Sequence, residues 1–253
     1  MFFKTKHQTI YYEIHGNNPK YILILPGWGD TRKTFTNIIN YLKNEYTIYI
    51  LDYPGFGNSP YPNKDLTIFD YANIINLFIK EKNIINPLII AHSFGGRITS
   101  ILLSKHKLKV DKIILIDVAG IKRRKKLKII IKEIIYKLLK KLSIFLPRIK
   151  KEKYLNKLIS VFSSNDYKTI PNNMRKTFQN IIKEDLKKYY KEIESETLII
   201  WGEKDIDTPL KDAYYLKKII KNSELIIYKN SNHFSYLQYP YLTNKIIKEF
   251  TIQ

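Results

Sequence analysis

The chain contains no cysteine in its 253 residues, which excludes disulfide bonds, a thiolate nucleophile and zinc sites built on sulfur. Its first residues lack the apolar segment and small-residue cleavage point of a signal peptide. No uninterrupted apolar run approaches the roughly 20 residues that a membrane-spanning helix needs. We therefore expect a cytoplasmic protein, with peripheral attachment to a membrane surface as the alternative.

Acidic residues are scarce, since 23 Asp and Glu stand against 44 Lys and Arg and give a formal net charge of +21. Such an excess raises the question of nucleic acids or anionic membranes as partners. A composition rich in lysine, isoleucine and asparagine explains the global charge without them, and we expect no nucleic-acid binding. Hydrophobic residues make up 44% of the chain, which is enough for a large core. The length suits one α/β domain with an insertion.

Apolar runs of strand length alternate with segments of helical periodicity along most of the chain. We expect strands at residues 2–6, 9–14, 21–25, 46–51, 88–90, 112–117, 197–201 and 224–228. We expect helices at residues 34–42, 71–79, 97–105, 210–220 and 241–250. This alternation predicts an α/β fold with an eight-stranded, mostly parallel sheet and helices on both faces. Active sites in such sheets lie at the carboxyl ends of the strands.

Ser93 lies between a predicted strand and a predicted helix, in the sequence AHSFGG at residues 91–96. Small residues two positions before and after a serine are typical of a nucleophile elbow, a tight turn that strains the serine backbone. The hydroxyl would stand clear of the sheet, and the N–H groups that open the next helix favour a negatively charged oxygen. Ser93 is therefore the candidate nucleophile, although this short pattern is weakly specific by itself.

A serine nucleophile needs a base to accept its proton and an acid to orient that base. The chain has only five histidines, so the base can be found by elimination. Two histidines belong to the N-terminal strands, His106 closes the helix after the elbow, and His92 adjoins Ser93, so its side chain should point elsewhere. His233 lies just beyond the last predicted strand, at the correct edge of the sheet, and is the predicted base.

Two aspartates are candidates for the acid. Asp205 follows the strand at 197–201 and gives the chain order Ser, Asp, His that is associated with this architecture. Asp117 ends the strand at 112–117 and could also reach the site, but we favour Asp205. For the nearby Asp207 we expect a different role, as the cap of the helix that follows Pro209.

An oxyanion hole requires two backbone N–H donors. Phe94 directly follows the nucleophile and supplies one donor. The second should come from the glycine-rich loop PGWGD at residues 26–30, where Trp28 is the best candidate. The loop DYPGFG at residues 52–57 is predicted to be structural, its glycines permitting a tight turn. This chemistry requires no metal or organic cofactor, and we expect none.

Five motifs together resemble those of the α/β-hydrolase superfamily: PGWG at 26–29, DYPGFGNS at 52–59, AHSFGG at 91–96, WGEKD at 201–205 and NHF at 232–234. They occur in order and span nearly the whole chain except a central insertion. The resemblance implies an α/β-hydrolase fold in which Ser93 is the nucleophile, Asp205 the acid and His233 the base. It also implies that the N–H groups of Trp28 and Phe94 bind the oxyanion.

The sequence departs from the family pattern at two positions. Ala91 stands where the elbow usually has its first glycine, and it is still small enough for the turn. Pro26 replaces a histidine that often precedes the oxyanion loop, which leaves the backbone donors in place. A serine nucleophile, rather than an aspartate, speaks against the epoxide-hydrolase and dehalogenase branches of the superfamily.

The alternation of strands and helices stops in a central segment, which resembles the helical cap of this superfamily. We expect an α/β-hydrolase core at 1–120 and 193–253 and a cap at 121–192, with further cap helices near 163–167 and 173–176 lining the pocket. From Lys122 to Lys153 there are 14 basic and two acidic residues, a charge of +12. Apolar residues recur there at helical spacing: Leu127, Ile130, Ile131, Ile134, Ile135, Leu138, Leu142 and Phe145.

This pattern predicts a basic amphipathic helix, for which three roles stay open. Its apolar stripe could cover the active site while its lysines face solvent. It could instead bind a membrane surface, or dock an acidic partner such as an acyl-carrier protein.

The sequence as a whole predicts a serine hydrolase that cleaves a carboxylic ester or related acyl bond of a small molecule through an acyl-serine intermediate. One alternative is a C–C bond hydrolase or lyase that uses the same triad. The other is a non-enzymatic module that binds a membrane or a ligand through the basic cap. The acyl-chain length, the pathway and the oligomeric state do not follow from the sequence.

Overall fold

A computed structural model describes residues 1–123, 127–143, 147, 150, 154, 158 and 170–252 of the chain. Phe145 and the segment 163–167, both predicted above to be part of cap helices, lie outside these described residues.

Eight strands form one sheet in the order β1-β2-β4-β3-β5-β6-β7-β8. Their bounds are β1 Phe2–Lys4, β2 Thr9–His15, β3 Tyr21–Leu25, β4 Thr47–Asp52, β5 Leu88–His92, β6 Ile113–Ile116, β7 Thr197–Gly202 and β8 Ser223–Tyr228. Strand β2 pairs antiparallel with β1 and β4, and the strands from β4 to β8 pair in parallel. The predicted eight-stranded, mostly parallel sheet is confirmed.

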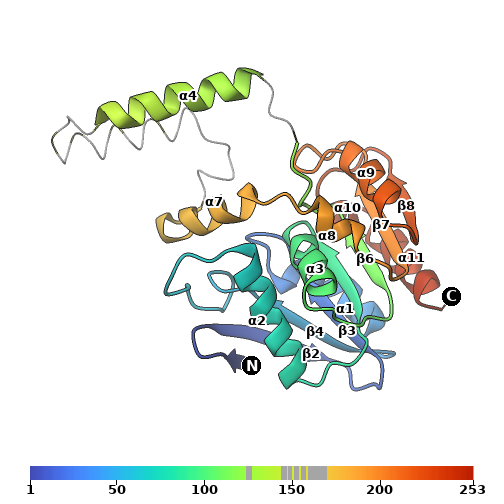
Figure 1. Ribbon diagram of the computed structural model, residues 1–253. Coiled ribbons are helices and arrows are strands. Elements are labelled where there is room, and N and C mark those ends of the chain that lie inside the picture. Colours follow the sequence, from blue (N-terminus) through green and yellow to red (C-terminus); the bar gives the residue numbers. More distant parts are fainter. Residues whose placement is uncertain are drawn as a thin grey trace.

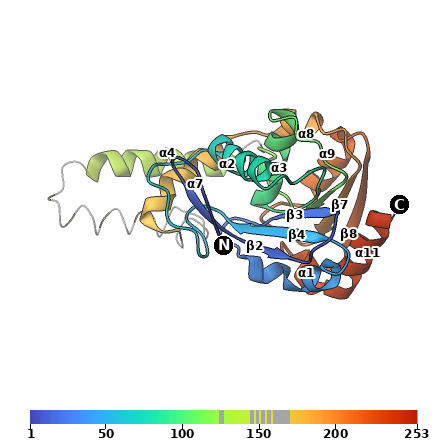
Figure 2. The same ribbon diagram turned by 90° about the horizontal axis from the view of Figure 1, so that it is seen from below.

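Helices cover both faces of the sheet (Figure 2). On one face lie α1 (Thr36–Leu42) and α11 (Pro240–Ile252), and the turn η1 (Arg32–Phe35) precedes α1. On the other face lie α2 (Ile68–Glu81), α3 (Phe94–Ser104), α8 (Lys187–Lys191) and α9 (Lys211–Ile219). Alternate residues of β3 show the two layers, because Ile22 and Ile24 pack with α1 and α11 while Leu23 and Leu25 pack with α2 and α3. Burial on both faces explains why the strands are apolar throughout rather than alternating.

Two helices begin earlier than their periodicity predicts. Helix α2 begins at Ile68, because the Thr67 hydroxyl accepts from the Asp70 N–H and the Asp70 carboxylate accepts from the Thr67 N–H, a capping box. Helix α3 begins at Phe94, immediately after Ser93. The short helix α10 (Ser235–Gln238), which the sequence did not predict, lies between β8 and α11.

The inserted segment contains α4 (Leu127–Leu142), the turn η3 (Asn172–Met174) and α7 (Arg175–Lys183). Helix α4 lies away from the sheet, and α7 lies between α4 and the core (Figure 1). The predicted basic helix is thus confirmed over 127–142. The boundaries proposed above for the core and the cap stay predictions. No helix in the described part of the chain is long and apolar enough to cross a bilayer.

The described part of α4 gives no support to the first of the three roles left open above, in which its apolar stripe covers the active site. Five of its members are between 43% and 59% exposed: Ile131, Ile134, Ile135, Leu138 and Leu142. None of them lines the cavity at the carboxyl ends of the strands, which α7 covers instead. Helical spacing reveals that a face is apolar but not what it packs against. Contact of this helix with a membrane or an acidic partner stays a prediction.

Candidate active site

Ser93 occupies the predicted elbow between β5 and α3. Its backbone has φ 46° and ψ −107°, in the left-handed half of conformational space that non-glycine residues rarely adopt. Hydrogen bonds hold this strained turn in place: the Ser93 N–H donates to the Ile116 carbonyl over 3.1 Å, and the Ser93 carbonyl accepts from the Ala119 and Gly96 N–H groups. Both anchors on the β6 side fix the hydroxyl above the carboxyl end of the sheet.

Glycine at position 95 is required by close packing between α3 and β3. A Cβ atom there would lie 2.0 Å from the Leu25 carbonyl oxygen, a distance that only a backbone shift could relieve. At Gly27, in the neighbouring loop, a Cβ atom would lie 2.9 Å from His92 Nδ1 and 3.4 Å from Ser93 Cβ. Small residues therefore let the oxyanion-loop backbone approach the elbow, which is the physical basis of both glycine motifs.

The three residues predicted to form the triad are joined by hydrogen bonds. His233 Nε2 lies 2.9 Å from Ser93 Oγ, and His233 Nδ1 lies 2.8 Å from Asp205 Oδ2. Asp205 is itself fixed, since its Oδ1 accepts from the N–H groups of Asp207 and Thr208, and its Oδ2 accepts from the Thr208 hydroxyl over 2.6 Å. The geometry is that of a nucleophile, a base and an orienting acid. The catalytic roles themselves stay predictions.

Asp205 and His233 stabilise each other's charged forms. Burial would raise the pKa of Asp205, but hydrogen bonds from His233 and Thr208 and the nearby imidazole outweigh burial and lower it. Burial would lower the pKa of His233, but the Asp205 carboxylate, with smaller contributions from Asp117 and Asp207, raises it. An ionised Asp205 next to an imidazole that binds protons readily suits a general base.

Asp117, the alternative acid, is fully buried and is not hydrogen-bonded to His233. Its carboxylate accepts from the Gly202 N–H over 2.7 Å and from the N–H and hydroxyl of Ser235. Burial raises the pKa of Asp117 to about 6. These bonds tie β7 to the start of α10, so Asp117 positions the loop that contains His233.

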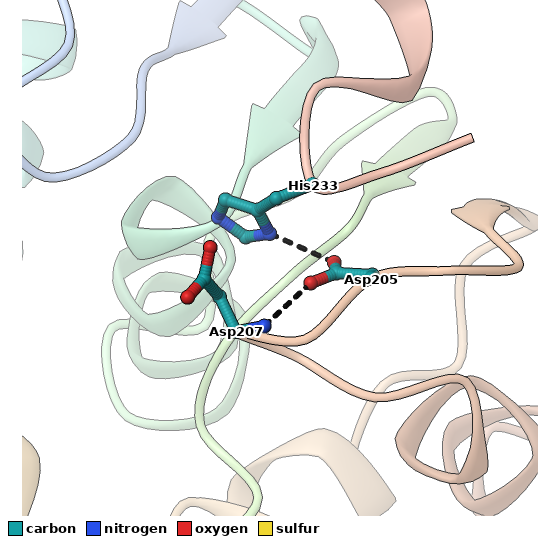
Figure 3. A group of neighbouring side chains, drawn as sticks. All are labelled: Asp205, Asp207 and His233. Carbon is teal, nitrogen blue, oxygen red and sulfur yellow. Dashed lines mark hydrogen bonds and ion pairs between the residues drawn. The ribbon is translucent and has the colours of Figure 1, made fainter.

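Asp207 does not cap the helix after Pro209, contrary to expectation. Helix α9 begins at Lys211, and its N-cap residue, Leu210, makes no side-chain hydrogen bond to it. The Asp207 carboxylate instead lies beside the imidazole of His233 (Figure 3). One carboxylate oxygen of Asp205, one of Asp207 and one ring nitrogen of His233 all lie within 4.8 Å of one another. The N–H groups of Asp207 and Thr208 donate to the Asp205 carboxylate, and the turn they form places Asp207 beside His233. The position of Asp207 two residues before Pro209 could not reveal this.

Trp28 and Phe94 both line the cavity in front of Ser93. Neither backbone N–H has a hydrogen-bond acceptor among the residues that the structure describes, so both are available to an oxyanion. The Trp28 and Phe94 rings pack edge to face with centroids 5.4 Å apart, and Phe178 of α7 packs on Trp28 at 5.3 Å.

The cavity has a volume of about 320 Å³, which suits a small substrate. It lies between the elbow, the loops after β3, β7 and β8, and the helix α7. Twelve described residues line it: Trp28, Ser93, Phe94, Arg97, Ala119, Phe178, Ile181, Ile182, Asp207, Thr208, His233 and Phe234.

A family model described as alpha/beta hydrolase fold matches residues 20–240. The chain belongs to the α/β hydrolase family. A curated relative, the pimeloyl-[acyl-carrier protein] methyl ester esterase of Wigglesworthia glossinidia brevipalpis, is 26% identical over 96% of this chain and 98% of its own. A probable serine hydrolase of Drosophila melanogaster is 29% identical over 39% of this chain and 31% of its own.

Solved structures share the fold of this α/β hydrolase. An esterase from Exiguobacterium antarcticum superposes with a TM-score of 0.74 at 22% identity, over 97% of this chain and 96% of that one. The enol-lactonase from Burkholderia xenovorans superposes with a TM-score of 0.76 at 16% identity, over the whole of both chains. At such identities these likenesses bear on the fold alone.

Two residues of this α/β hydrolase have roles at the site that the sequence analysis missed. Thr208 donates to Asp205 and lies 3.3 Å from His233 Nδ1. His92 is buried, and its Nε2 lies 2.9 Å from the His233 carbonyl oxygen, so the imidazole supports the backbone of the predicted base. The sequence contains a partial indication for His92, because a histidine next to the nucleophile must pack under the site. It contains no indication for Thr208.

Proposed function

We propose that this α/β hydrolase cleaves a carboxylic ester or related acyl bond of a small molecule through an acyl-serine intermediate. The observation that supports this most directly is the unbroken hydrogen-bond chain Ser93–His233–Asp205 at the floor of the cavity. The Wigglesworthia relative, whose name states a methyl ester as its substrate, supports an ester as the bond cleaved.

The acylation step begins when Ser93 Oγ attacks the carbonyl carbon and His233 Nε2 takes the hydroxyl proton. The carbonyl oxygen becomes negatively charged, and the N–H groups of Trp28 and Phe94 stabilise it. Asp205 keeps the imidazole in the tautomer whose Nε2 can accept and stabilises the imidazolium. His233 then gives its proton to the departing alcohol, which leaves an acyl-Ser93.

Deacylation repeats the same steps with water as the nucleophile. His233 Nε2 takes a proton from a water molecule, whose oxygen attacks the acyl carbon. The second tetrahedral oxyanion rests on the same two N–H groups. It collapses with release of the acid, and His233 returns its proton to Ser93 Oγ.

A fluorophosphonate probe tests the proposal before any substrate is known. We expect covalent labelling at Ser93, detected by intact mass and located by peptide mapping, because a nucleophile with a bound base attacks phosphorus as it attacks a carbonyl. Heat-denatured protein and the Ser93→Ala variant are the controls and should remain unlabelled. A natively folded protein without label, or with label at another serine, would count against the proposal.

The pH profile of ester hydrolysis should reflect the raised pKa of His233. The imidazole must be neutral to accept the serine proton, so activity falls as pH drops through a pKa higher than that of an ordinary histidine. Asp207→Asn removes one of the negative charges that raise this pKa, so the acid limb should move to lower pH. Asp65→Asn, a charge change at a residue that neither lines the cavity nor is among the groups that raise the pKa of His233, should leave the limb in place. An unshifted limb in Asp207→Asn would contradict the assignment of that limb to His233.

A C–C bond hydrolase or lyase would use the same three side chains. Comparing p-nitrophenyl esters with diketone and succinyl-type substrates distinguishes the two reactions, because the ester reaction requires no ketone next to the bond that breaks. Faster turnover of the diketones would favour the C–C reaction.

A further inference from the structure

Arg97 lines the cavity, although the proposed hydrolysis gives it no task. It lies on α3 four residues after Ser93, which is one helical turn or about 6 Å along the axis. Side chains of a helix lean toward its N-terminus, so the Arg97 side chain leans back toward the end of α3 that begins at the nucleophile.

The guanidinium of Arg97 is poorly satisfied by the protein. Its Nη1 donates to two backbone carbonyls at the end of α7, those of Ile181 at 3.3 Å and Glu184 at 3.5 Å, and both bonds are long. The carboxylates of Asp185 and Glu184 act on Arg97 through charge alone, since neither is hydrogen-bonded to it. Among the described residues, Nε and Nη2 have no acceptor. Arginine has five N–H donors and keeps its charge in proteins, even though burial lowers the pKa of Arg97.

The rest of the cavity explains where an anion would bind. Arg97 and Asp207 are the charged side chains, besides the titratable His233, that line it among the described residues. Asp207 is exposed and lies next to His233, so it repels an anion from that side. Near Arg97 the wall is apolar, from Ile181 and Ile182 of α7. A partly buried cation in such surroundings is stabilised by an anionic ligand that uses its free donors.

We infer that Arg97 binds a carboxylate of the substrate, so that the molecules hydrolysed are half-esters of small dicarboxylic acids. Nε and Nη2 form the planar fork that matches the two oxygens of a carboxylate. The ester carbonyl then lies at Ser93 and the free carboxylate at Arg97, in a cavity of about 320 Å³. This inference rests on the proposed ester hydrolysis and adds the substrate class.

Paired substrates test the inference. Monomethyl succinate, glutarate and adipate are each compared with the dimethyl ester of the same acid, and the ratio of kcat/KM for the anionic to the neutral ester is measured. We expect the wild type to prefer one half-ester, and Arg97→Gln to lower the ratio about 10- to 100-fold, as expected for charge-assisted hydrogen bonds worth about 1.5–3 kcal/mol. Arg97→Lys, which keeps the charge and loses the fork, should be intermediate.

The ratio separates this role from a structural one. If Arg97 only holds the end of α7, Arg97→Gln lowers both rates together and leaves the ratio unchanged, which would overturn the inference. Lys105→Gln is the matched control, because it removes one positive charge from the end of the same helix, outside the cavity. The ratio should be unchanged in this variant; an equal fall there would assign the effect to net charge and also overturn the inference.

Binding without turnover separates the inference from the proposed function. Monomethyl glutarate is titrated calorimetrically into Ser93→Ala and into the double variant Ser93→Ala, Arg97→Gln, with the monomethyl esters of succinate and adipate in parallel. We expect binding to the first and its loss in the second. Binding without ester hydrolysis by the wild type would overturn the proposed function but keep the carboxylate site. Hydrolysis of neutral esters without any binding of the half-esters would keep the function and overturn the site.

Discussion

Replacing Ser93 by alanine should lower kcat/KM for any ester that the wild type hydrolyses by about four to six orders of magnitude. The hydroxyl is the proposed nucleophile, and the hydrogen bond from its oxygen to His233 Nε2 is the route by which its proton leaves. What remains in the variant is oxyanion stabilisation and substrate binding, which accelerate the attack of water only modestly by comparison. Initial rates of the wild type and the variant, measured at a pH above the acid limb of the profile, give the ratio of their kcat/KM values.

Ser100→Ala is the matched control for this variant. Ser100 lies on the same helix α3, and its hydroxyl donates to the Arg97 carbonyl at 2.8 Å without contact to His233. This variant should keep most of the activity. Alanine at 93 tolerates the φ of 46° about as poorly as serine does, so the two proteins should unfold at similar urea concentrations. Activity above about 1% of wild type in folded Ser93→Ala would identify a different nucleophile.

The sheet and the position of the site could be predicted because both depend on local patterns. Short, mostly apolar runs define the parallel strands, which are four to six residues long, and β3, predicted at 21–25, is found there. The carboxyl ends of parallel strands meet at one edge, so residues far apart in sequence, such as Ser93, Asp205 and His233, are brought together by topology alone. The structure places His233 within hydrogen-bond distance of both Ser93 and Asp205.

The remainder of the site depends on contacts that leave no periodic signal. The apolar spacing of α4 predicted its helix but not that α7 would cover the cavity, since any apolar face can pack against several partners. Thr208 and Asp207 acquire their positions from the turn around the Asp205 carboxylate. Arg97 resembles any charged residue on a helix until the structure shows that it faces an apolar cavity.

Asp205→Asn should lower kcat/KM for esters by about four orders of magnitude while leaving the fold intact. Asp205 Oδ1 accepts from two backbone N–H groups, those of Asp207 and Thr208. An asparagine at this position therefore keeps its carbonyl oxygen there and turns its NH₂ toward His233. Nδ1 must then accept a hydrogen bond, and the ring proton moves to Nε2, which faces Ser93. In that tautomer the imidazole cannot take the serine proton. Initial rates of the variant measure the loss of activity, and its unfolding in urea measures separately whether the fold is intact.

Asp117→Asn is the comparison that distinguishes the two aspartates, because it makes the same chemical change at the alternative acid. Its carboxylate bonds to Gly202 and Ser235 rather than to the imidazole, so we expect a loss of stability and less than about a tenfold loss of kcat/KM. The opposite outcome, an inactive folded Asp117→Asn beside an active Asp205→Asn, would move the role of the acid to Asp117. Two aspartates with similar burial would then differ in function for a reason that the hydrogen bonds to His233 do not explain.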